Sequence, residues 1–163
     1  MARVLIVGCG CRGRELATAL VEEGHRVRGT TRKPERLEVI ESVCGEAALA
    51  DPDLLGTLLP LLEGVSVVCW LMGSADGPAD SVTALHGPRL ASLLAKLVDT
   101  PVRGLVYEGA GTVAVPLLSE GGVIARAAAV TYRMPVQVVE QPPEDAPAWV
   151  AAMRSAVGCV LSA

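Results

Sequence analysis

The 163-residue sequence contains no phenylalanine and only two tryptophans and two tyrosines. Its core must therefore be built from aliphatic side chains, and the stacking aromatics with which proteins hold single-stranded nucleic acids are scarce. The formal net charge is −4, whereas general nucleic-acid binders carry a basic face. We therefore expect no nucleic-acid partner.

Long hydrophobic runs and metal-ligand patterns are also missing. No apolar run reaches the 18 or so residues that a membrane-spanning helix needs, and the opening MARVLIVG is too short for a signal peptide. We therefore expect a cytoplasmic protein without membrane association. Cys9 and Cys11 are separated by one residue, closer than paired zinc ligands usually are, and His25 and His86 stand alone, so no metal site is predicted.

The five cysteines, an odd number without regular spacing, suit a reducing compartment. Cys44, Cys69 and Cys159 lie in or near apolar segments and are interpreted as small core residues. A redox role for Cys9 or Cys11 is the less favoured alternative, because a helix N-terminus nearby would lower the pKa of a thiol.

Apolar runs alternate with glycine and proline stops along the whole chain. Strands are expected at residues 3–7, 25–30, within 44–50, at 65–73, 102–108 and 135–140. Helices are expected at 12–23, 34–42, from Asp51 or Pro52 to Gly64, at 81–98 with a break at Gly87 and Pro88, at 119–130, and at 146–160 with Asp145 as N-cap.

Parallel neighbouring strands need crossover connections, which helices supply. The alternation therefore predicts an α/β fold in one domain, residues 1–163: a three-layer, doubly wound parallel sheet (Rossmann fold) with strand order 3-2-1-4-5-6 and no separate substrate domain. A ligand crevice is expected between the carboxyl ends of the first and fourth strands.

Gly8, Gly10 and Gly13 match G-x-G-x-x-G between the first strand and the first helix. Gly8 permits the tight turn, Gly10 lets the main chain approach a pyrophosphate, and Gly13 allows the helix to pack closely on the strand. Free amides and the helix dipole favour a phosphate there. The predicted cofactor-binding loop comprises Gly8, Cys9, Gly10, Cys11, Arg12 and Gly13. A glycine turn that serves only packing is the alternative.

The end of the second strand bears on the choice of cofactor. NAD-binding proteins usually place an Asp or Glu there for the adenosine ribose, but no acidic residue occurs between residues 24 and 34. Arg32 would pair with a 2′-phosphate and Lys33 would add positive charge. This pattern favours NADP over NAD, and a solvated basic turn is the alternative. The residues that supply hydroxyl groups or positive charge at this strand end are Thr30, Thr31, Arg32 and Lys33.

Eight of the 14 basic residues fall in the first 36 positions, and we expect them to concentrate positive charge near the opening glycines. They are Arg3, Arg12, Arg14, Arg26, Arg28, Arg32, Lys33 and Arg36. Asp51, after the third strand, is interpreted first as a helix N-cap and second as a partner for an adenine amino group. Leu71, Met72 and Gly73 end the fourth strand, where ribose and nicotinamide would lie.

Three segments carry a family resemblance: VLIVGCGCRGRELATALVEEGHRVRGTTRKPE, VSVVCWLMG and RGLVYEGAG. They resemble the atypical, epimerase-like branch of the short-chain dehydrogenase/reductase superfamily over most of residues 3–111. The resemblance implies an NAD(P)-binding fold and, in active relatives, a Ser or Thr after the fifth strand together with a Tyr-x-x-x-Lys pair.

This chain departs from that catalytic pattern. Gly109 and Ala110 occupy the serine positions. Tyr107 is followed four residues later by Gly111, and Tyr132 by Val136. The two lysines, Lys33 and Lys96, complete neither pair. Without a lysine to lower the pKa of the tyrosine, the usual proton transfer has no evident agent.

Two functions follow from these patterns. The first is an NADP(H)-binding or sensing module without catalysis of its own. The second is a small NADPH-dependent oxidoreductase or epimerase-like enzyme whose catalytic groups are Glu108, Tyr107 or residues of a partner subunit, although Tyr107 is interpreted first as a packing residue with its hydroxyl at the edge. A third hypothesis, a regulatory nucleotide-binding domain like those attached to potassium channels, ranks lower. The fourth hypothesis is a purely structural protein that keeps the fold and binds no nucleotide. Later helices that are apolar on more than one side suggest a homodimer.

Overall fold

The computed structural model describes all of residues 1–163, and its six strands form one parallel sheet. The strands are β1 (Arg3–Val7), β2 (Arg26–Thr31), β3 (Gly45–Leu49), β4 (Val67–Trp70), β5 (Gly104–Glu108) and β6 (Val136–Val139). They lie in the order β3-β2-β1-β4-β5-β6, and every neighbouring pair is parallel. The predicted strand order is confirmed, and it reverses between β1 and β4, where ligands of such sheets bind.

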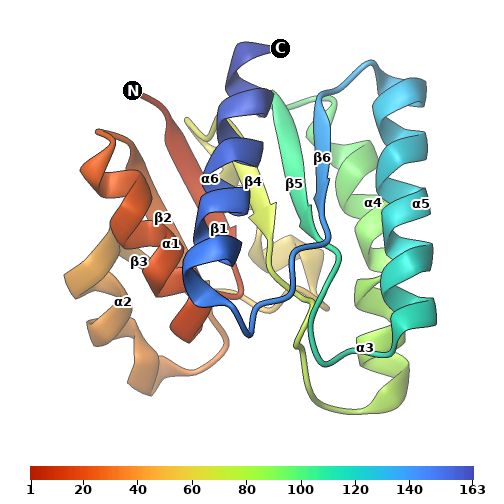
Figure 1. The fold of residues 1–163 in the computed structure, drawn as a ribbon, viewed down its shortest axis with the longest axis horizontal. Helices are drawn as coiled ribbons and strands as arrows, with labels where there is room; N and C mark the ends of the chain where they lie inside the picture. The colour runs from red at the N-terminus through yellow and green to blue at the C-terminus, as the bar shows by residue number, and fades with distance from the viewer.

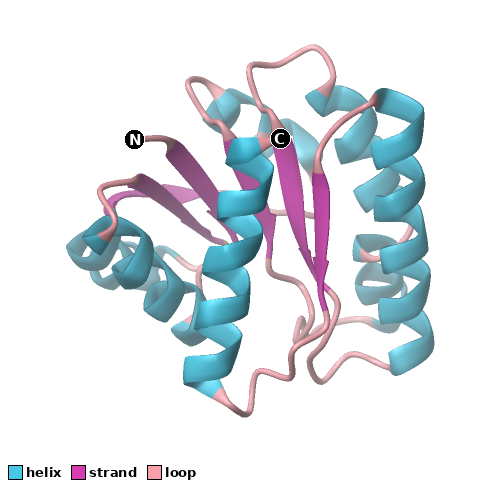
Figure 2. Ribbon diagram, turned by 45° about the horizontal axis from the view of Figure 1, so that its top comes forward, coloured by secondary structure: helices cyan, strands magenta, loops and turns pink.

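Helices cover both faces of the sheet. They are α1 (Cys11–Glu22), α2 (Leu37–Cys44), α3 (Ala79–Leu85), α4 (Pro88–Leu97), α5 (Val115–Tyr132) and α6 (Ala146–Ser162). Helices α1, α2 and α6 pack on one face and α3, α4 and α5 on the other, which gives the three predicted layers (Figures 1 and 2). None of these helices is both long and apolar enough to cross a membrane.

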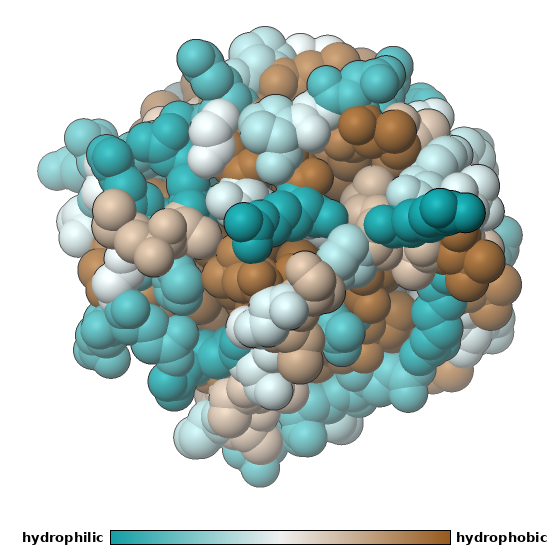
Figure 3. All heavy atoms as spheres, turned by 90° about the horizontal axis from the view of Figure 1, so that it is seen from above, coloured by the Kyte–Doolittle hydropathy of each residue, from teal (hydrophilic) through white to brown (hydrophobic).

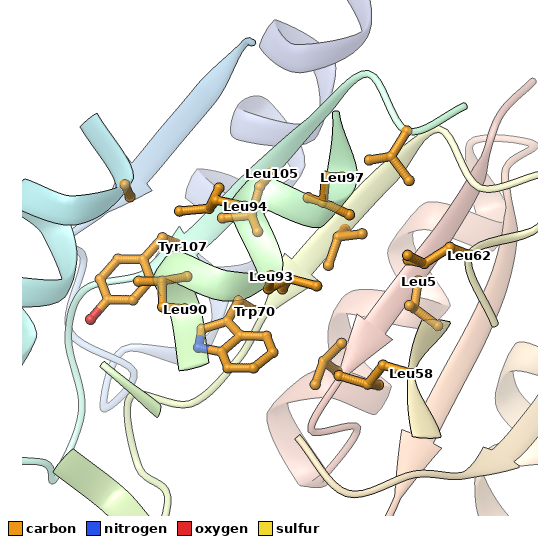
Figure 4. Packing of buried hydrophobic residues seen from close by; sticks show 14 of the residues in the cluster. Leu5, Leu58, Leu62, Trp70, Leu90, Leu93, Leu94, Leu97, Leu105 and Tyr107 are labelled. Carbon is orange, nitrogen blue, oxygen red and sulfur yellow. The ribbon is translucent and has the colours of Figure 1, made fainter. Parts of the chain in front are cut away.

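Each face of the sheet has its own aliphatic core because successive strand residues point to opposite sides. In β1, Leu5 belongs to the core under α4 and Ile6 to the core under α1. Figure 4 shows the first of these cores, in which leucines of α4 pack against Trp70. The indole N–H of Trp70 donates to the Leu85 carbonyl oxygen at 3.0 Å, so this buried polar group is satisfied.

The helix predicted from Asp51 or Pro52 to Gly64 is wrong. The segment forms two short 3₁₀ helices, η2 (Leu55–Thr57) and η3 (Leu59–Leu62). Its leucines suit a helix, but Gly56 and Pro60 interrupt it, and a proline has no N–H to continue the hydrogen-bond ladder. Asp51 therefore caps no helix: its carboxylate accepts the Asp53 N–H at 2.9 Å in a local turn.

Other helix boundaries differ less. Helix α5 begins at Val115 instead of residue 119 because a proline stands in its first turn. The second predicted helix opens as a 3₁₀ turn, η1 (Pro34–Arg36), before α2. The break at Gly87 is confirmed, since α3 and α4 are separate helices. Asp145 is confirmed as the N-cap of α6, where it accepts the Ala148 N–H at 3.1 Å.

Candidate functional site

The glycine turn joins β1 to α1 at the carboxyl edge of the sheet. Gly8 has a φ of +83°, and a Cβ there would collide with the Met72 side chain and the Leu71 carbonyl. A Cβ at Gly13 would lie 3.2 Å from the Gly8 carbonyl oxygen. The expected structural roles are confirmed for both: Gly8 makes the turn, and Gly13 lets α1 pack against the end of β1.

The start of α1 presents unpaired donors. Gly10 is its N-cap and no side chain caps the helix. The main-chain N–H groups of Cys11, Arg12 and Gly13 have no acceptor within the protein. Gly10 is exposed, and no heavy atom lies within 4 Å of the position that its Cβ would take. Donors at a positive helix end beside open space fit an anionic diphosphate.

Thr30 fixes this turn to β2. Its buried hydroxyl accepts the Gly8 N–H and donates to the Ile6 carbonyl oxygen, both at 3.3 Å. Its own carbonyl oxygen accepts the Cys9 N–H at 2.9 Å. The Thr30 hydroxyl, one of the hydroxyls expected at this strand end, is therefore already bonded within the protein. Its structural role was missed because the pairing of β2 with the turn depends on tertiary contacts that no local pattern contains.

The residues after Thr30 remain available. Arg32 and Lys33 are exposed and take part in no ion pair. The Thr31 hydroxyl accepts the Lys33 N–H at 3.1 Å, which leaves its own proton free to donate. Since β2 lies next to β1, this positively charged segment stands beside the glycine turn. Its predicted contact with an adenosine 2′-phosphate stays a prediction.

Three of the early arginines lie elsewhere. Arg3, Arg26 and Arg28 all approach the Glu46 carboxylate, at 3.2, 3.7 and 2.9 Å. Arg3 and Arg26 start their strands, so the cluster belongs to the edge opposite the glycine turn. Figure 3 looks onto that edge, where hydrophilic side chains lie among apolar ones. Burial alone would raise the pKa of Glu46, but the guanidinium groups, Arg28 first, keep it below its ordinary value. The expected concentration of early basic residues near the glycines is therefore wrong for these three arginines.

Leu71, Met72 and Gly73 continue β4 past the glycine turn. The Leu71 N–H donates to the Val7 carbonyl oxygen at 3.0 Å, and the Met72 side chain lies against Gly8. All three residues are buried, and they flank the turn as the topology predicts. Their contact with the ribose and nicotinamide stays a prediction.

Glu108 lies behind Gly73 at the carboxyl end of β5. This last residue of β5 is 5% exposed, and its carboxylate accepts the Gly73 N–H at 2.8 Å. Burial raises the pKa of Glu108 to about 7, although the Gly73 bond, the nearby Trp149 indole and the Arg12 charge act in the opposite direction. The buried Nε1 of Trp149 lies near this carboxyl group but makes no well-formed hydrogen bond. Glu108 is thus able to hold or release a proton near neutral pH.

Tyr107 and His86 form a buried pair. The His86 Nδ1 lies 2.6 Å from the Tyr107 hydroxyl oxygen, and Nε2 lies 2.8 Å from the Met72 carbonyl oxygen. A carbonyl oxygen only accepts, so Nε2 carries the proton and Nδ1 accepts from the tyrosine. Burial lowers the pKa of His86 and raises that of Tyr107. Figure 4 shows the Tyr107 ring beside Leu90.

Two expectations are corrected by this pair. The Tyr107 hydroxyl lies in the core instead of at the edge, and His86 is no isolated residue. Packing as the role of Tyr107 is confirmed, whereas its use as a catalytic group has no support, since its hydroxyl is buried and already bonded. Sequence reasoning missed His86 because nothing local links the end of α3 to β5.

The loops after β4 and β5 are joined. The Val113 N–H donates to the Gly73 carbonyl oxygen at 3.0 Å, and the Thr112 N–H to the Ser74 hydroxyl at 3.2 Å. A Cβ at Gly111 would collide with the Gly73 main chain. Next to this junction lies a depression of about 330 Å³. Its lining residues are Gly109, Ala110, Gly111, Val115, Leu118, Ser119, Glu140, Pro142, Pro143 and Glu144.

The cysteines divide into buried and exposed groups. Cys44 and Cys69 are buried as expected, and burial raises the pKa of Cys69 to about 12. Cys159 is exposed, so its assignment to the core is wrong: it lies on the outer side of α6. Cys11 is exposed and Cys9 is buried. No three His, Cys, Asp or Glu side chains are grouped as metal ligands would be.

Comparison with known proteins gives two kinds of likeness. No family model matches the chain. The 2-dehydropantoate 2-reductases of Shigella flexneri and Escherichia coli O157:H7 are each 33% identical to it over 118 residues. That stretch is 68% of this chain and 34% of either enzyme, so the chain spans about a third of the length of the curated relatives it matches.

Solved structures resemble the chain more completely. BdcA from E. coli superposes with a TM-score of 0.76 at 14% identity, over 94% of this chain and 89% of BdcA. The chain has a Rossmann fold. A superfamily member from Agrobacterium tumefaciens with bound NAD gives a TM-score of 0.69 at 19% identity, over 85% of this chain and 48% of that one. A Bacillus halodurans protein assigned as an NAD-dependent epimerase/dehydratase gives 0.63 at 16%, over 88% and 71%.

The fold that the sequence resemblance implied is thereby confirmed. At these identities the likeness to solved structures concerns the Rossmann fold alone, and the two comparisons lead to different groups of proteins. What the chain binds must therefore be argued from its own residues.

Proposed function

We propose that this chain binds a nicotinamide dinucleotide at the start of α1 and prefers NADP(H) to NAD(H). The observation that carries the proposal is the set of three unpaired N–H groups, on Cys11, Arg12 and Gly13, beside the open space at Gly10. A diphosphate is the part of a dinucleotide that such donors suit. The NAD in the Agrobacterium structure and the reductase activity named for the curated relatives support the same ligand class.

Different residues of the chain would contact different parts of the dinucleotide. The turn from Gly8 to Gly13 would hold the diphosphate, and residues 71–73 would flank the nicotinamide half. Arg32 and Lys33 would meet the adenosine 2′-phosphate, because their charges are not neutralised by any carboxylate. When bound, the dinucleotide supplies hydride-transfer chemistry.

We infer further that the chain acts as a cofactor-binding or sensing module without the usual Tyr/Lys catalysis. The Tyr107 hydroxyl is already hydrogen-bonded to His86, and Tyr132 lies at the end of α5. Lys96 lies in the last turn of α4, and Lys33 follows β2. No tyrosine is therefore accompanied by a lysine in the sequence pattern that the catalytic pair requires.

A small NADPH-dependent reductase or epimerase-like enzyme is the second candidate, and Glu108 is the observation that favours it. Its buried carboxyl group, with a pKa near 7, lies at the carboxyl end of β5 beside Gly73 and can exchange a proton near neutral pH. A full set of substrate-binding residues would then come from a partner subunit or from a further part of the protein.

Dinucleotide binding is tested by titrating the protein with NADPH and NADH while following nucleotide fluorescence. In Gly10→Ala we expect a loss of at most about 1 kcal/mol in stability, because alanine is a poorer N-cap than glycine, while the φ of −80° suits alanine and nothing crowds its Cβ. Its NADPH affinity should fall at least about tenfold, because the methyl group occupies the diphosphate position. Equal affinity in wild type and Gly10→Ala would refute this site.

The cofactor preference is tested with Arg32→Asp. This change should weaken NADPH binding and improve NADH binding relative to wild type, because a carboxylate repels a 2′-phosphate and accepts ribose hydroxyls. Lys96→Asp, the same kind of charge change at an exposed site on α4, serves as the control. An unaltered preference in Arg32→Asp would remove Arg32 from the proposal.

Turnover separates the two candidate functions. The module predicts NADPH binding without oxidation when 2-dehydropantoate or other small carbonyl compounds are added. The enzyme predicts oxidation that slows in Glu108→Gln while NADPH affinity is retained.

We also propose that the chain self-associates through α5. Val115, Val123 and Val130 on this helix are 72%, 64% and 81% exposed. A second copy would cover them. Light scattering should give the mass of a dimer, and Val123→Glu should give that of a monomer.

A further inference from the structure

Two buried thiols face each other beneath the glycine turn. Cys9 lies between Gly8 and Gly10, and Cys44 is the last residue of α2. Their Sγ atoms are 3.9 Å apart, and the residues are 3% and 6% exposed. The proposed binding of a dinucleotide uses main-chain groups of the turn and leaves both thiols without a role.

Glycines shape the space in which the Cys9 thiol lies. A Cβ at Gly29 of β2 would lie 2.9 Å from the Cys9 sulfur, and one at Gly13 of α1 would lie 3.4 Å from it. A larger residue at Gly29 would have to displace the Cys9 thiol, whereas a Cβ at Gly13 would lie at ordinary contact distance from it. The close approach of β2 thus limits the space around the Cys9 thiol, which lies against Cys44.

The surroundings make the two sulfurs unequal. The hydrogen bond that Cys9 donates lowers the pKa of Cys44, whereas burial raises it. The nearby Arg14 guanidinium also lowers the pKa of Cys44, and Arg14 takes part in no ion pair. The same hydrogen bond, together with burial, raises the pKa of Cys9. Cys44 is thus the sulfur that ionises first, and Cys9 keeps its proton.

We propose that Cys9 and Cys44 form a peroxide-sensitive dithiol that closes to a disulfide under the phosphate-binding turn and weakens dinucleotide binding. Disulfide formation stands on the geometry of the two thiols alone. Only the effect on binding rests on the proposed function.

The reaction uses hydrogen peroxide as oxidant. The Cys44 thiolate attacks one peroxide oxygen, the O–O bond breaks, and hydroxide leaves and takes a proton from solvent to become water. Cys44 is then a sulfenic acid. The Cys9 sulfur attacks the Cys44 sulfur, the S–O bond breaks, and the departing oxygen leaves with the Cys9 proton as a second water. The two thiols lose two electrons in total, and one peroxide is reduced to two waters.

We expect bond formation to move the turn. A disulfide has an S–S distance of about 2.05 Å, so the sulfurs must approach one another from their present 3.9 Å separation. Because Cys9 lies within the turn, this movement displaces the unpaired N–H groups that follow it. Loss of one charge-assisted hydrogen bond corresponds to about a tenfold weaker affinity.

The test uses hydrogen peroxide on the whole chain in a Cys11→Ser background, so that only Cys9 can supply the thiol from its peptide. Alkylation and peptide mass spectrometry should find Cys9 linked to Cys44. NADPH affinity should fall about tenfold after oxidation and recover with a thiol reductant. Cys44→Ser should abolish the link and the response. Cys159→Ser, at an exposed position on α6, should retain both.

Two results would overturn the proposal. Oxidation of Cys159 by peroxide while Cys9 and Cys44 remain free thiols would show that the pair does not react. A linked peptide with unchanged NADPH affinity would show that the disulfide does not affect binding. If the reduced protein fails to bind NADPH, the proposed function is wrong, and peptide mapping still decides whether the disulfide forms.

Discussion

Replacing Glu108 by glutamine should change how the stability of the protein depends on pH. Glutamine keeps a carbonyl oxygen for the Gly73 N–H, which Glu108 accepts at 2.8 Å, and removes the charge. The carboxyl group is 5% exposed, and burial raises its pKa from 4.5 to about 7. Such a rise corresponds to about 3 kcal/mol between the folded and unfolded states.

The sign follows from proton binding. Between pH 4.5 and 7 the folded protein binds the Glu108 proton more tightly than the unfolded chain does. The stabilising contribution is complete below pH 4.5 and is lost as the pH rises through 7. The wild type should therefore lose about 2–3 kcal/mol of unfolding free energy from this group between pH 5 and 9. Its His86 acts in the opposite direction, because burial lowers the pKa of that imidazole and acid then costs stability.

Urea unfolding of wild type and Glu108→Gln at pH 5, 6, 7, 8 and 9 checks this prediction. Subtracting the two curves cancels the contribution of His86, and the advantage of the variant should grow with pH by about 2–3 kcal/mol. Glu140→Gln, an exposed carboxylate beyond β6, is the matched control and should show no such trend. A difference that stays flat from pH 5 to 9 would show that Glu108 ionises as it does in water.

Four further substitutions test other features of the structure. Tyr107→Phe should lower the unfolding free energy by about 1–2 kcal/mol, because Nδ1 of buried His86 loses its donor; a urea titration that matches wild type would contradict this pairing. Gly111→Ala should cost more than about 3 kcal/mol, since φ is +152° and the Cβ would strike the Gly73 main chain. In Gly158→Ala, on the exposed side of α6, thermal unfolding should instead show a gain of about 0.5–1 kcal/mol. Glu46→Gln should destabilise the protein by about 1 kcal/mol at pH 7. The loss should shrink as acid protonates the wild-type carboxylate, because the pKa of Glu46 lies below its ordinary value. A loss that does not shrink as the pH falls would contradict an ionic origin.

The order of strands and the glycine turn could be predicted because both follow from local patterns. Short aliphatic runs separated by helical stretches leave little choice other than a parallel sheet with crossovers. Within that sheet, Gly8 and Gly13 do what their spacing indicates. The helix predicted over residues 51–64 is wrong. The leucine spacing favours a helix there, but Gly56 and Pro60 interrupt it.

The polar contacts inside the molecule could not be predicted. Glu108 meets Gly73, and His86 meets Tyr107, across strands and helices that only tertiary packing brings together. A composition that suggests an aliphatic core gives no sign of which polar groups enter it. The positions of the early arginines could not be predicted either. Strand register, and not closeness in sequence, places Arg3, Arg26 and Arg28 beside Glu46.

The bare main-chain contact between Gly73 and Gly111 limits how this scaffold can be re-engineered. At the junction of these two loops there is no space for the Cβ of a hydroxyl-bearing side chain. The backbone there would have to be lengthened before a residue is exchanged. New chemistry on this chain would thus begin with an insertion, and only afterwards with a substitution.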